Sequence, residues 1–218
     1  MFSSVLPAAA GFLLFAFFMG NALRVFDFKF HLFLLHVGPM ALLSFALLPS
    51  GLALIQNKAS AKGAARAWFA KAHGVTNLFV TASVIVGLVA IFVNKDRMGK
   101  AHLSSNHSWA GAAAAIAMAA NAAGGLFKLL TKRAWLWRDD IHRYSGLLAV
   151  QLAWGAAVSG LYSGWGRAAL GGAEGVNATV LALTAVAALT LGAGRWSWAL
   201  QALAVRCRRG RQGKLRTE

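Results

Sequence analysis

The chain has 218 residues, of which 58% are hydrophobic and 13% charged, and its formal net charge is +16. A soluble domain has about twice this share of charged residues, so the composition indicates a protein embedded in lipid. The basic residues fall between and after apolar runs, which is typical of membrane-flanking loops and argues against a nucleic-acid partner. The single cysteine, Cys207, excludes a disulfide within the chain and an iron–sulfur cluster held by four thiolates.

Six apolar windows follow one another along the chain, each of about the 20 residues that span a bilayer. They cover about 4–23, 32–56, 74–94, 108–130, 143–165 and 176–194. The first lacks the basic leader and cleavage site of a secretory signal, so we expect it to be a spanning helix. Pro39 and Pro49 in the second window predict a kink or a late helix start. The fourth window is nearly all small residues, which either let helices pack closely or leave room for a flat ligand.

This pattern predicts an all-α membrane protein with six transmembrane helices. The second and fourth connections and the C-terminal segment carry 16 of the 22 lysines and arginines, and the other three connections carry six. The positive-inside bias therefore predicts that both termini lie in the cytosol or an equivalent compartment. We expect one transmembrane domain over residues 1–205 and a basic cytosolic tail over 206–218.

Four of the six histidines stand at the start of the second to fifth windows. They are His36, His73, His107 and His142, and their separations are 37, 34 and 35 residues. Each step equals about one spanning helix plus one connection, so successive members alternate between the two membrane faces. His36 and His107 are then expected on the outer side, and His73 and His142 on the cytosolic side.

Two histidines at matching depth on neighbouring helices can supply both axial ligands of a haem iron, an arrangement suited to electron transfer. A hydrocarbon core of about 30 Å accommodates one such haem in each leaflet. The spacing therefore predicts two bis-histidine haems that carry electrons across the membrane. The alternatives are histidines that are merely hydrogen-bonded to neighbours, and metal-ion transport along a histidine-lined path. Against transport, the six acidic residues all lie in connections or the tail, whereas cation carriers place acids inside the bundle.

Short motifs surround these histidines. The third connection reads KDRMGKAHLSSNHSWAG (95–111), KAH (71–73) begins the third window, and HRYSG (142–146) begins the fifth. Over residues 30–165 these motifs resemble the cytochrome b561 family of transmembrane di-haem reductases, in particular the short cytochrome b561 domain-containing proteins. The resemblance implies a four-helix core (helices 2 to 5) with one flanking helix at each end, holding two b-type haems. In the family the first histidine pairs with the third and the second with the fourth, as alternation also predicts.

The first histidine departs from the family pattern. Family members place proline directly after it, whereas here Val37 and Gly38 separate His36 from Pro39. Alignment on Met40 and the following apolar run keeps His36 as the ligand, with His31 as the alternative.

The resemblance further implies an oxidoreductase that takes electrons from a cytosolic donor, commonly ascorbate. It delivers them to an acceptor on the opposite side, such as a ferric chelate or monodehydroascorbate. Lys71 resembles a basic position that the family uses for the donor. Arg66, Arg138 and Arg143 are neighbours in sequence, although anchoring at the membrane surface explains them equally well.

On the outer side, Lys100 and His102 are candidates to hold the acceptor or to contact a haem propionate. A loop histidine without a role is the alternative for His102. A second hypothesis for the whole chain is an accessory subunit of a larger membrane electron-transport complex. The small-residue faces and the basic tail also suit docking into such a complex or a homodimer.

Overall fold

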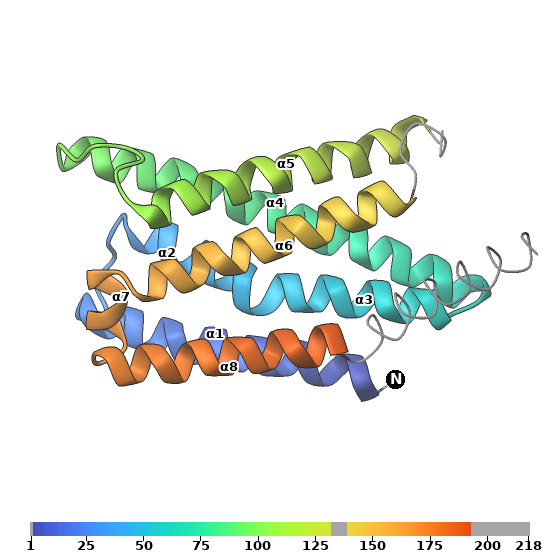
Figure 1. Ribbon diagram of the computed structural model, residues 1–218, viewed down its shortest axis with the longest axis horizontal. Coiled ribbons are helices and arrows are strands. Elements are labelled where there is room, and N and C mark those ends of the chain that lie inside the picture. The colour runs from blue at the N-terminus through green and yellow to red at the C-terminus, as the bar shows by residue number, and fades with distance from the viewer. Residues whose placement is uncertain (1, 132–138, 193–218) are drawn as a thin grey trace, which may run out of the picture.

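The computed structural model describes residues 2–131 and 139–192, and within these ranges the chain is helical, with no strand. Its elements are α1 (Phe2–Val25), α2 (Leu34–Ala41), the π-helical η1 (Leu42–Leu47), α3 (Leu48–Ser60), α4 (Gly63–Arg97), α5 (Asn106–Thr131), α6 (Asp139–Leu161), α7 (Gly164–Ala169) and α8 (Ala173–Gly192) (Figure 1). The predicted tail over 206–218 and Arg138 lie outside the described residues.

The prediction of six spanning helices is confirmed: six segments of the described chain are long and apolar enough to cross a membrane. The second of them is the continuous run of α2, η1 and α3. The third differs most from its predicted window of 74–94, because α4 begins eleven residues earlier, at Gly63. The added stretch, GAARAWFAKAH, is too polar for a hydropathy window, but its alanines, arginine and lysine are good helix formers.

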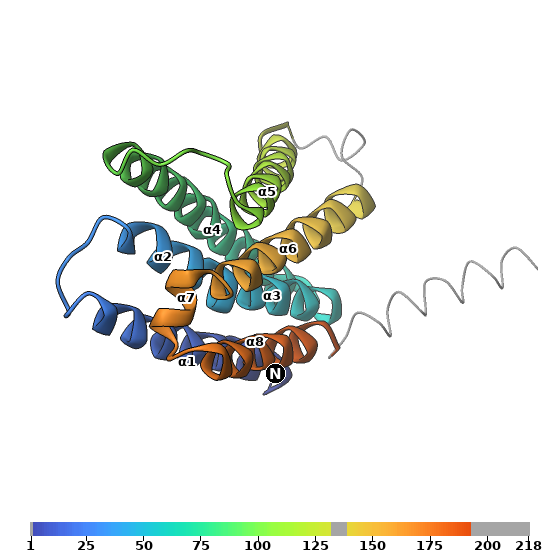
Figure 2. The same ribbon diagram turned by 60° about the vertical axis from the view of Figure 1, so that its left-hand side comes forward.

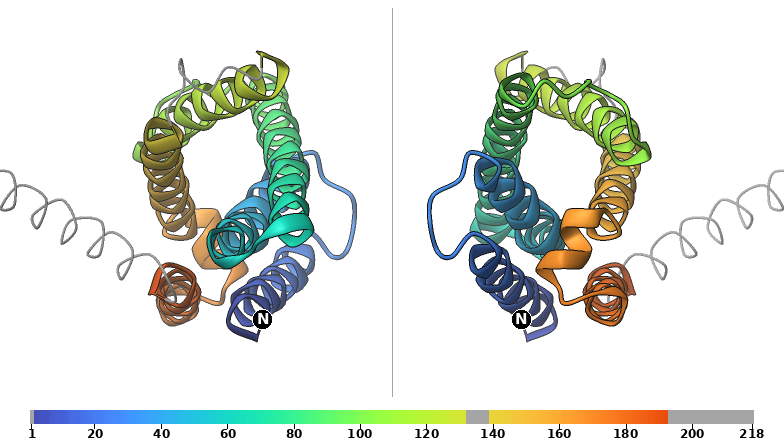
Figure 3. Two further views of the ribbon diagram at one scale, coloured as in Figure 1. Left: turned by 90° about the vertical axis from the view of Figure 1, so that its right-hand side faces the viewer. Right: turned by 90° about the vertical axis from the view of Figure 1, so that its left-hand side faces the viewer.

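The helices form a bundle with four members around a central space. Viewed end-on, the α2–α3 run, α4, α5 and α6 form a ring, and α1 and α8 lie side by side beneath it (Figure 3). The most extensive packing joins α5 to α6 and the α2–α3 run to α4, whereas α4 and α5 touch much less. Short α7 crosses from the end of α6 to the start of α8 (Figure 2).

Pro49 explains the π-helical segment in the second span. In η1 the amide of Leu48 donates to Leu43 O, five residues back, but the next residue is Pro49, which has no N–H to donate to Ser44 O. The buried indole of Trp154 in α6 supplies the missing donor, with Nε1 2.9 Å from Ser44 O. The predicted kink is therefore a π-bulge, and a side chain from another helix satisfies its orphan carbonyl.

Aromatic rings cluster around Trp165 at one end of the bundle. Trp165 of α7 lies with its centroid 5.2 Å from Phe33, 6.2 Å from Phe26 and 6.3 Å from Phe18. Offset and edge-to-face pairs at these separations add to the stability that apolar burial provides. Trp165, Phe33 and Phe18 also line a cavity of about 580 Å³ within the bundle.

Candidate functional site

His36 of α2 and His107 of α5 face each other at the end of the bundle that carries α7. Their ring centroids lie 6.3 Å apart, with the ring planes at 73°. Both line a cavity of about 580 Å³, which we call the outer cavity, and we call these two residues the outer pair. Alternation predicted this pair from sequence, and the structure brings its members together.

The start of α5 fixes the position of His107. The amide of Ser108 donates to Ser105 Oγ at 3.2 Å, and the amide of Ser105 donates to Ser108 Oγ at 3.0 Å. This reciprocal arrangement is that of a capping box, with serine at both positions. It starts the helix just before His107 and so places the imidazole in the first turn.

Backbone carbonyls of neighbouring helices orient both rings of the outer pair. Nδ1 of His36 is 2.9 Å from Gly87 O, and Nδ1 of His107 is 2.9 Å from Ala156 O and 3.2 Å from Ser159 Oγ. A carbonyl only accepts, so Nδ1 carries the proton and the lone pair resides on Nε2. Metal-bound histidines usually have this second interaction, because it fixes both the tautomer and the ring orientation.

Two glycines on neighbouring helices leave room for the outer pair, because a side chain at either position would clash with its surroundings. A Cβ at Gly160 of α6 would lie 2.8 Å from His107 Cε1, so the ring occupies room that any larger residue would fill. A Cβ at Gly87 of α4 would lie 2.6 Å from Met40 Cε, one turn beyond His36. The close approach of α2 to α4 at Gly87 brings its carbonyl to His36.

The dimensions of the outer cavity suit a haem. Two imidazoles that share an iron, each nitrogen about 2 Å from the metal, have centroids about 6 Å apart, which matches the observed separation. The volume falls within the range of about 300–1,000 Å³ found for small-molecule pockets. Gly111, Ala112 and Ala115 line the wall on α5, so part of its small-residue surface faces the cavity while another part packs against α6.

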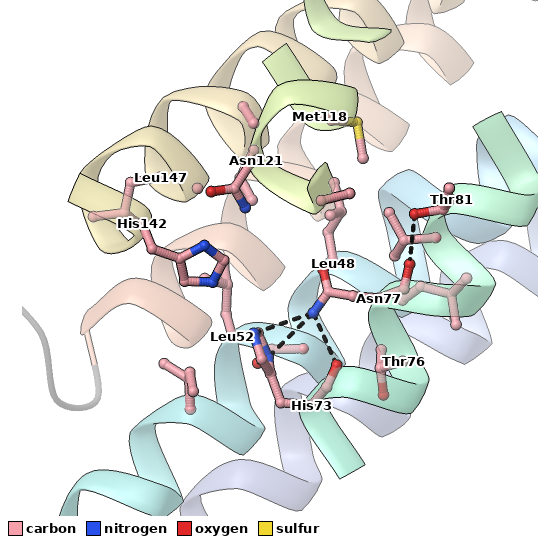
Figure 4. Close-up of a pocket in the computed structure, with 18 of the residues that line it drawn as sticks. Leu48, Leu52, His73, Thr76, Asn77, Thr81, Met118, Asn121, His142 and Leu147 are labelled. Atoms are coloured by element: carbon pink, nitrogen blue, oxygen red, sulfur yellow. Dashed lines mark hydrogen bonds between the residues drawn. The ribbon is translucent and has the colours of Figure 1, made fainter. Parts of the chain in front are cut away.

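His73 of α4 and His142 of α6 lie at the opposite end of the bundle, and we call them the inner pair. Figure 4 shows their rings directed into one space between the helices. Nδ1 of His73 is 3.1 Å from Gly51 O of α3, which repeats the carbonyl contact of the outer pair. A Cβ at Gly125 of α5 would lie 3.4 Å from His142 Cε1. The inner cavity has about 90 Å³, so a haem between these rings requires the surrounding side chains to move apart.

Amide side chains distinguish the inner cavity from the outer one. Nδ2 of Asn77 lies 3.1 Å from His73 Nε2 and donates to His73 O at 2.8 Å (Figure 4). Asn121 of α5 accepts from Ser145 Oγ at 2.8 Å and lines the same cavity. Neither asparagine was a predicted site residue, although Asn77 lies one helical turn after His73 and therefore on the same face.

The alternative first ligand, His31, lies outside both cavities. It is exposed, its ring stacks on Phe26 at a centroid distance of 4.6 Å, and its Nδ1 accepts from the amide of Phe33 at 3.2 Å. Within the described residues, no three His, Cys, Asp or Glu side chains gather at one point. Among the described histidines, His36 and His107 share the outer cavity, and His73 and His142 share the inner one.

The predicted donor residues lie near the inner end. Lys71 and Arg66 are both exposed on α4, but Lys71 is two residues before His73 and so lies on another face of the helix. Arg66 is seven residues before His73, which puts it on the same face. Arg143 lines the inner cavity, and its guanidinium is 3.7 Å from Asp140.

The predicted acceptor residues lie near the outer end. His102 lines the outer cavity, stacks on Phe92 at 4.6 Å and contacts Asp96 Oδ1 through Nε2 at 2.7 Å. Lys100 is exposed and does not line the cavity. Lys95 does line it, although the sequence showed it only as one of the loop cations. Its spacing from Leu88 and Ile91, at seven and four residues, is the signal that could have placed it on the cavity face of α4.

Six helices of spanning length, with histidines paired across the bundle, define an integral membrane protein with two candidate ligand pairs. The chain matches the family model described as eukaryotic cytochrome b561 over residues 30–167, and it belongs to this family. This confirms the resemblance seen in the motifs. Membership implies that the chain binds b-type haem, the cofactor of this membrane-protein family.

Curated relatives agree with the family match. The chain is 29% identical to transmembrane reductase CYB561D2 of Mus musculus over 107 residues, which are 47% of this chain and 48% of the mouse protein. It is 30% identical to transmembrane reductase CYB561D2 of Homo sapiens over 108 residues, 48% of this chain and 49% of the human protein. The matched part thus spans about half the length of these relatives.

Proposed function

We propose that the chain carries electrons across the membrane through two b-type haems, each held by one histidine pair. His36 and His107 are the axial ligands of the outer haem, and His73 and His142 are those of the inner haem. The observation that carries this proposal is the outer pair: two carbonyl-oriented imidazoles 6.3 Å apart across a cavity of about 580 Å³. Haem bound there supplies a one-electron iron couple with both axial positions filled by protein.

The pairing of the histidines favours this function over metal-ion transport. A protein site for a free divalent cation usually needs three or more protein ligands at one point, whereas a haem iron needs two from opposite sides. The cavity walls are mostly apolar, and Trp165 and Phe33 contribute aromatic rings to them. Such surroundings suit electron transfer between buried centres.

We further propose the direction of electron flow. The inner end of the bundle is the basic one, and the positive-inside bias assigns it to the cytosol. An anionic donor such as ascorbate is attracted there by Arg66, Arg143 and Lys71, with the first two nearest to the inner pair by helical register and cavity lining. An acceptor such as a ferric chelate or monodehydroascorbate takes electrons near His102 and Lys100.

Absorption spectra of the purified protein, oxidised and dithionite-reduced, test the haem proposal. We expect a reduced b-type α-band with low-spin character and two haems per chain by pyridine haemochrome assay. His107→Ala and His73→Ala should each lose about half of the haem, whereas His31→Ala should keep all of it. Absence of the α-band when haem is supplied during expression rules out the proposal.

Vesicles that contain the protein test the function itself. Vesicles loaded with ascorbate should reduce external ferricyanide or ferric chelate at a rate that His107→Ala abolishes. A haem-loaded protein that never transfers electrons across the vesicle membrane would instead support the accessory-subunit alternative.

A further inference from the structure

Lys95 has a position unlike that of the cations around it. It lies in the last turns of α4 on the face that carries Leu88 and Ile91, and together with them it lines the outer cavity. Its side chain is half-buried, whereas Arg97, two residues later, is exposed. A lysine at the end of a spanning helix normally extends its ammonium into water at the membrane surface. The ammonium of Lys95 is held by Ala101 O of the following loop, beside the outer cavity that the side chain lines.

The ammonium of Lys95 has no acidic partner among the described residues. The adjacent carboxylate, Asp96, contacts His102 Nε2 at 2.7 Å. Lys95 Nζ donates to Ala101 O at 3.0 Å, which uses one of its three N–H donors. Lys95 lines the same cavity as both imidazoles of the outer pair. The remaining N–H donors of the ammonium can therefore bind an anion that enters the outer cavity.

We propose that Lys95 binds a propionate carboxylate of the outer haem and that its charge favours the reduced haem. This inference rests on the proposed function, because it requires a haem at His36 and His107. A positive charge held near the iron stabilises the reduced form, which carries one positive charge fewer than the oxidised form. The carboxylate of the haem is the anion brought to this wall whenever the cofactor is bound. An anionic acceptor would share the chemistry but would arrive only transiently.

Dye-mediated redox titration of the purified haem-loaded protein tests the charge effect. We expect Lys95→Gln to keep both haems and to lower the midpoint potential of one transition by about 59 mV, a tenfold fall in the ratio of reduced to oxidised haem at fixed potential. The affected transition should be the one that His107→Ala removes. Lys95→Arg, which keeps the charge, should stay near the wild-type value. Arg97→Gln, which removes an exposed cation from the same helix end, is the matched control and should leave both transitions unchanged.

Resonance Raman spectra test the carboxylate itself. The propionate-bending band of the outer haem should shift in Lys95→Gln, should shift less in Lys95→Arg, and should be unchanged in Arg97→Gln. An unchanged potential in Lys95→Gln, or an equal fall in Arg97→Gln, overturns the inference. A lowered potential in Lys95→Gln with an unchanged propionate band overturns the carboxylate assignment. If added ascorbate or ferric chelate then restores the potential, the anion that Lys95 binds is the acceptor. Absence of haem from the wild-type protein is a failure of the proposed function, which is a different result from any of these.

Discussion

Gly160→Ala tests whether the space beside His107 is part of the outer haem site. The new Cβ would lie 2.8 Å from His107 Cε1 and 3.1 Å from Nδ1. Ordinary contact needs at least about 3.4 Å, so the ring must retreat by roughly half an ångström or more. The ring is tied to Ala156 O at 2.9 Å and to Ser159 Oγ at 3.2 Å, so retreat stretches these bonds and turns Nε2 away from His36.

The expected energy follows from two opposing effects. Overpacking of a well-packed interior costs about 1–3 kcal/mol. Replacing glycine by alanine inside a helix returns about 1 kcal/mol. We therefore expect the free energy of unfolding to fall by 0 to about 2 kcal/mol. The affinity for the outer haem should fall by about tenfold or more, because a loss of about 1.4 kcal/mol in binding corresponds to a factor of ten.

The assay is haem content and the low-spin spectrum of the purified variant. Gly155→Ala is the matched control: Gly155 lies on the same helix, and a Cβ there meets nothing within 4 Å. The control should keep both haems and gain slight stability. If Gly160→Ala retains the outer haem with the spectrum and affinity of Gly155→Ala, the steric reasoning for this site is wrong.

Three further variants test other parts of the structure. Ser105→Ala removes the N-cap of α5, which should cost about 1 kcal/mol in thermal unfolding and weaken the outer haem but not the inner one. Trp154→Phe leaves Ser44 O without its donor in the interior, and a fall of about 1 kcal/mol in unfolding stability is expected; an unchanged melting curve would show that another group satisfies the carbonyl. Arg66→Ala should raise the KM for ascorbate more than Lys71→Ala does, because Arg66 shares a helix face with His73; the reverse order in a reduction assay would contradict the register.

Much of the fold was predictable because its signals are local or periodic. Apolar windows of spanning length revealed the six helices, and the near-regular spacing of four histidines gave their alternation between the two ends. The pairing of His36 with His107 followed from these two facts. The choice of His36 over His31 rested on spacing and alignment, and the structure adds that His36 lines the outer cavity whereas His31 does not.

Other features depend on contacts between distant residues, which local sequence signals specify only in part. Pro39 and Pro49 indicated a distortion, but the indole that satisfies Ser44 O comes from 110 residues further along the chain. Lys71 was predicted to bind the donor because it is close to His73 in sequence. The helical register places it on another face of α4. The role of Lys95 depends on which side of α4 faces the cavity, and the sequence can show this only after the paired helix is known.

The histidine contacts reveal a reciprocal arrangement of the core. The α2–α3 run carries His36 and also the Gly51 carbonyl that orients His73, while α4 carries His73 and the Gly87 carbonyl that orients His36. Each of these two elements thus supplies one ligand and positions the other. The same two elements pack extensively against each other, and so do α5 and α6.

The core is therefore built from two well-packed helix pairs that face each other across the cavities. Each proposed haem would join one helix pair to the other. His36 of the first helix pair lies opposite His107 of the second, and His73 of the first lies opposite His142 of the second. Direct packing between α4 and α5 is sparse, and Trp154 of α6 joins the halves through Ser44 O of η1, so a bound haem would add to a small direct contact between them. A histidine exchanged for alanine at one end should therefore remove mainly the haem at that end. Any partial loss of the second haem in such a variant measures the coupling between the two ends, and this loss should increase with temperature because fewer contacts then hold the halves together.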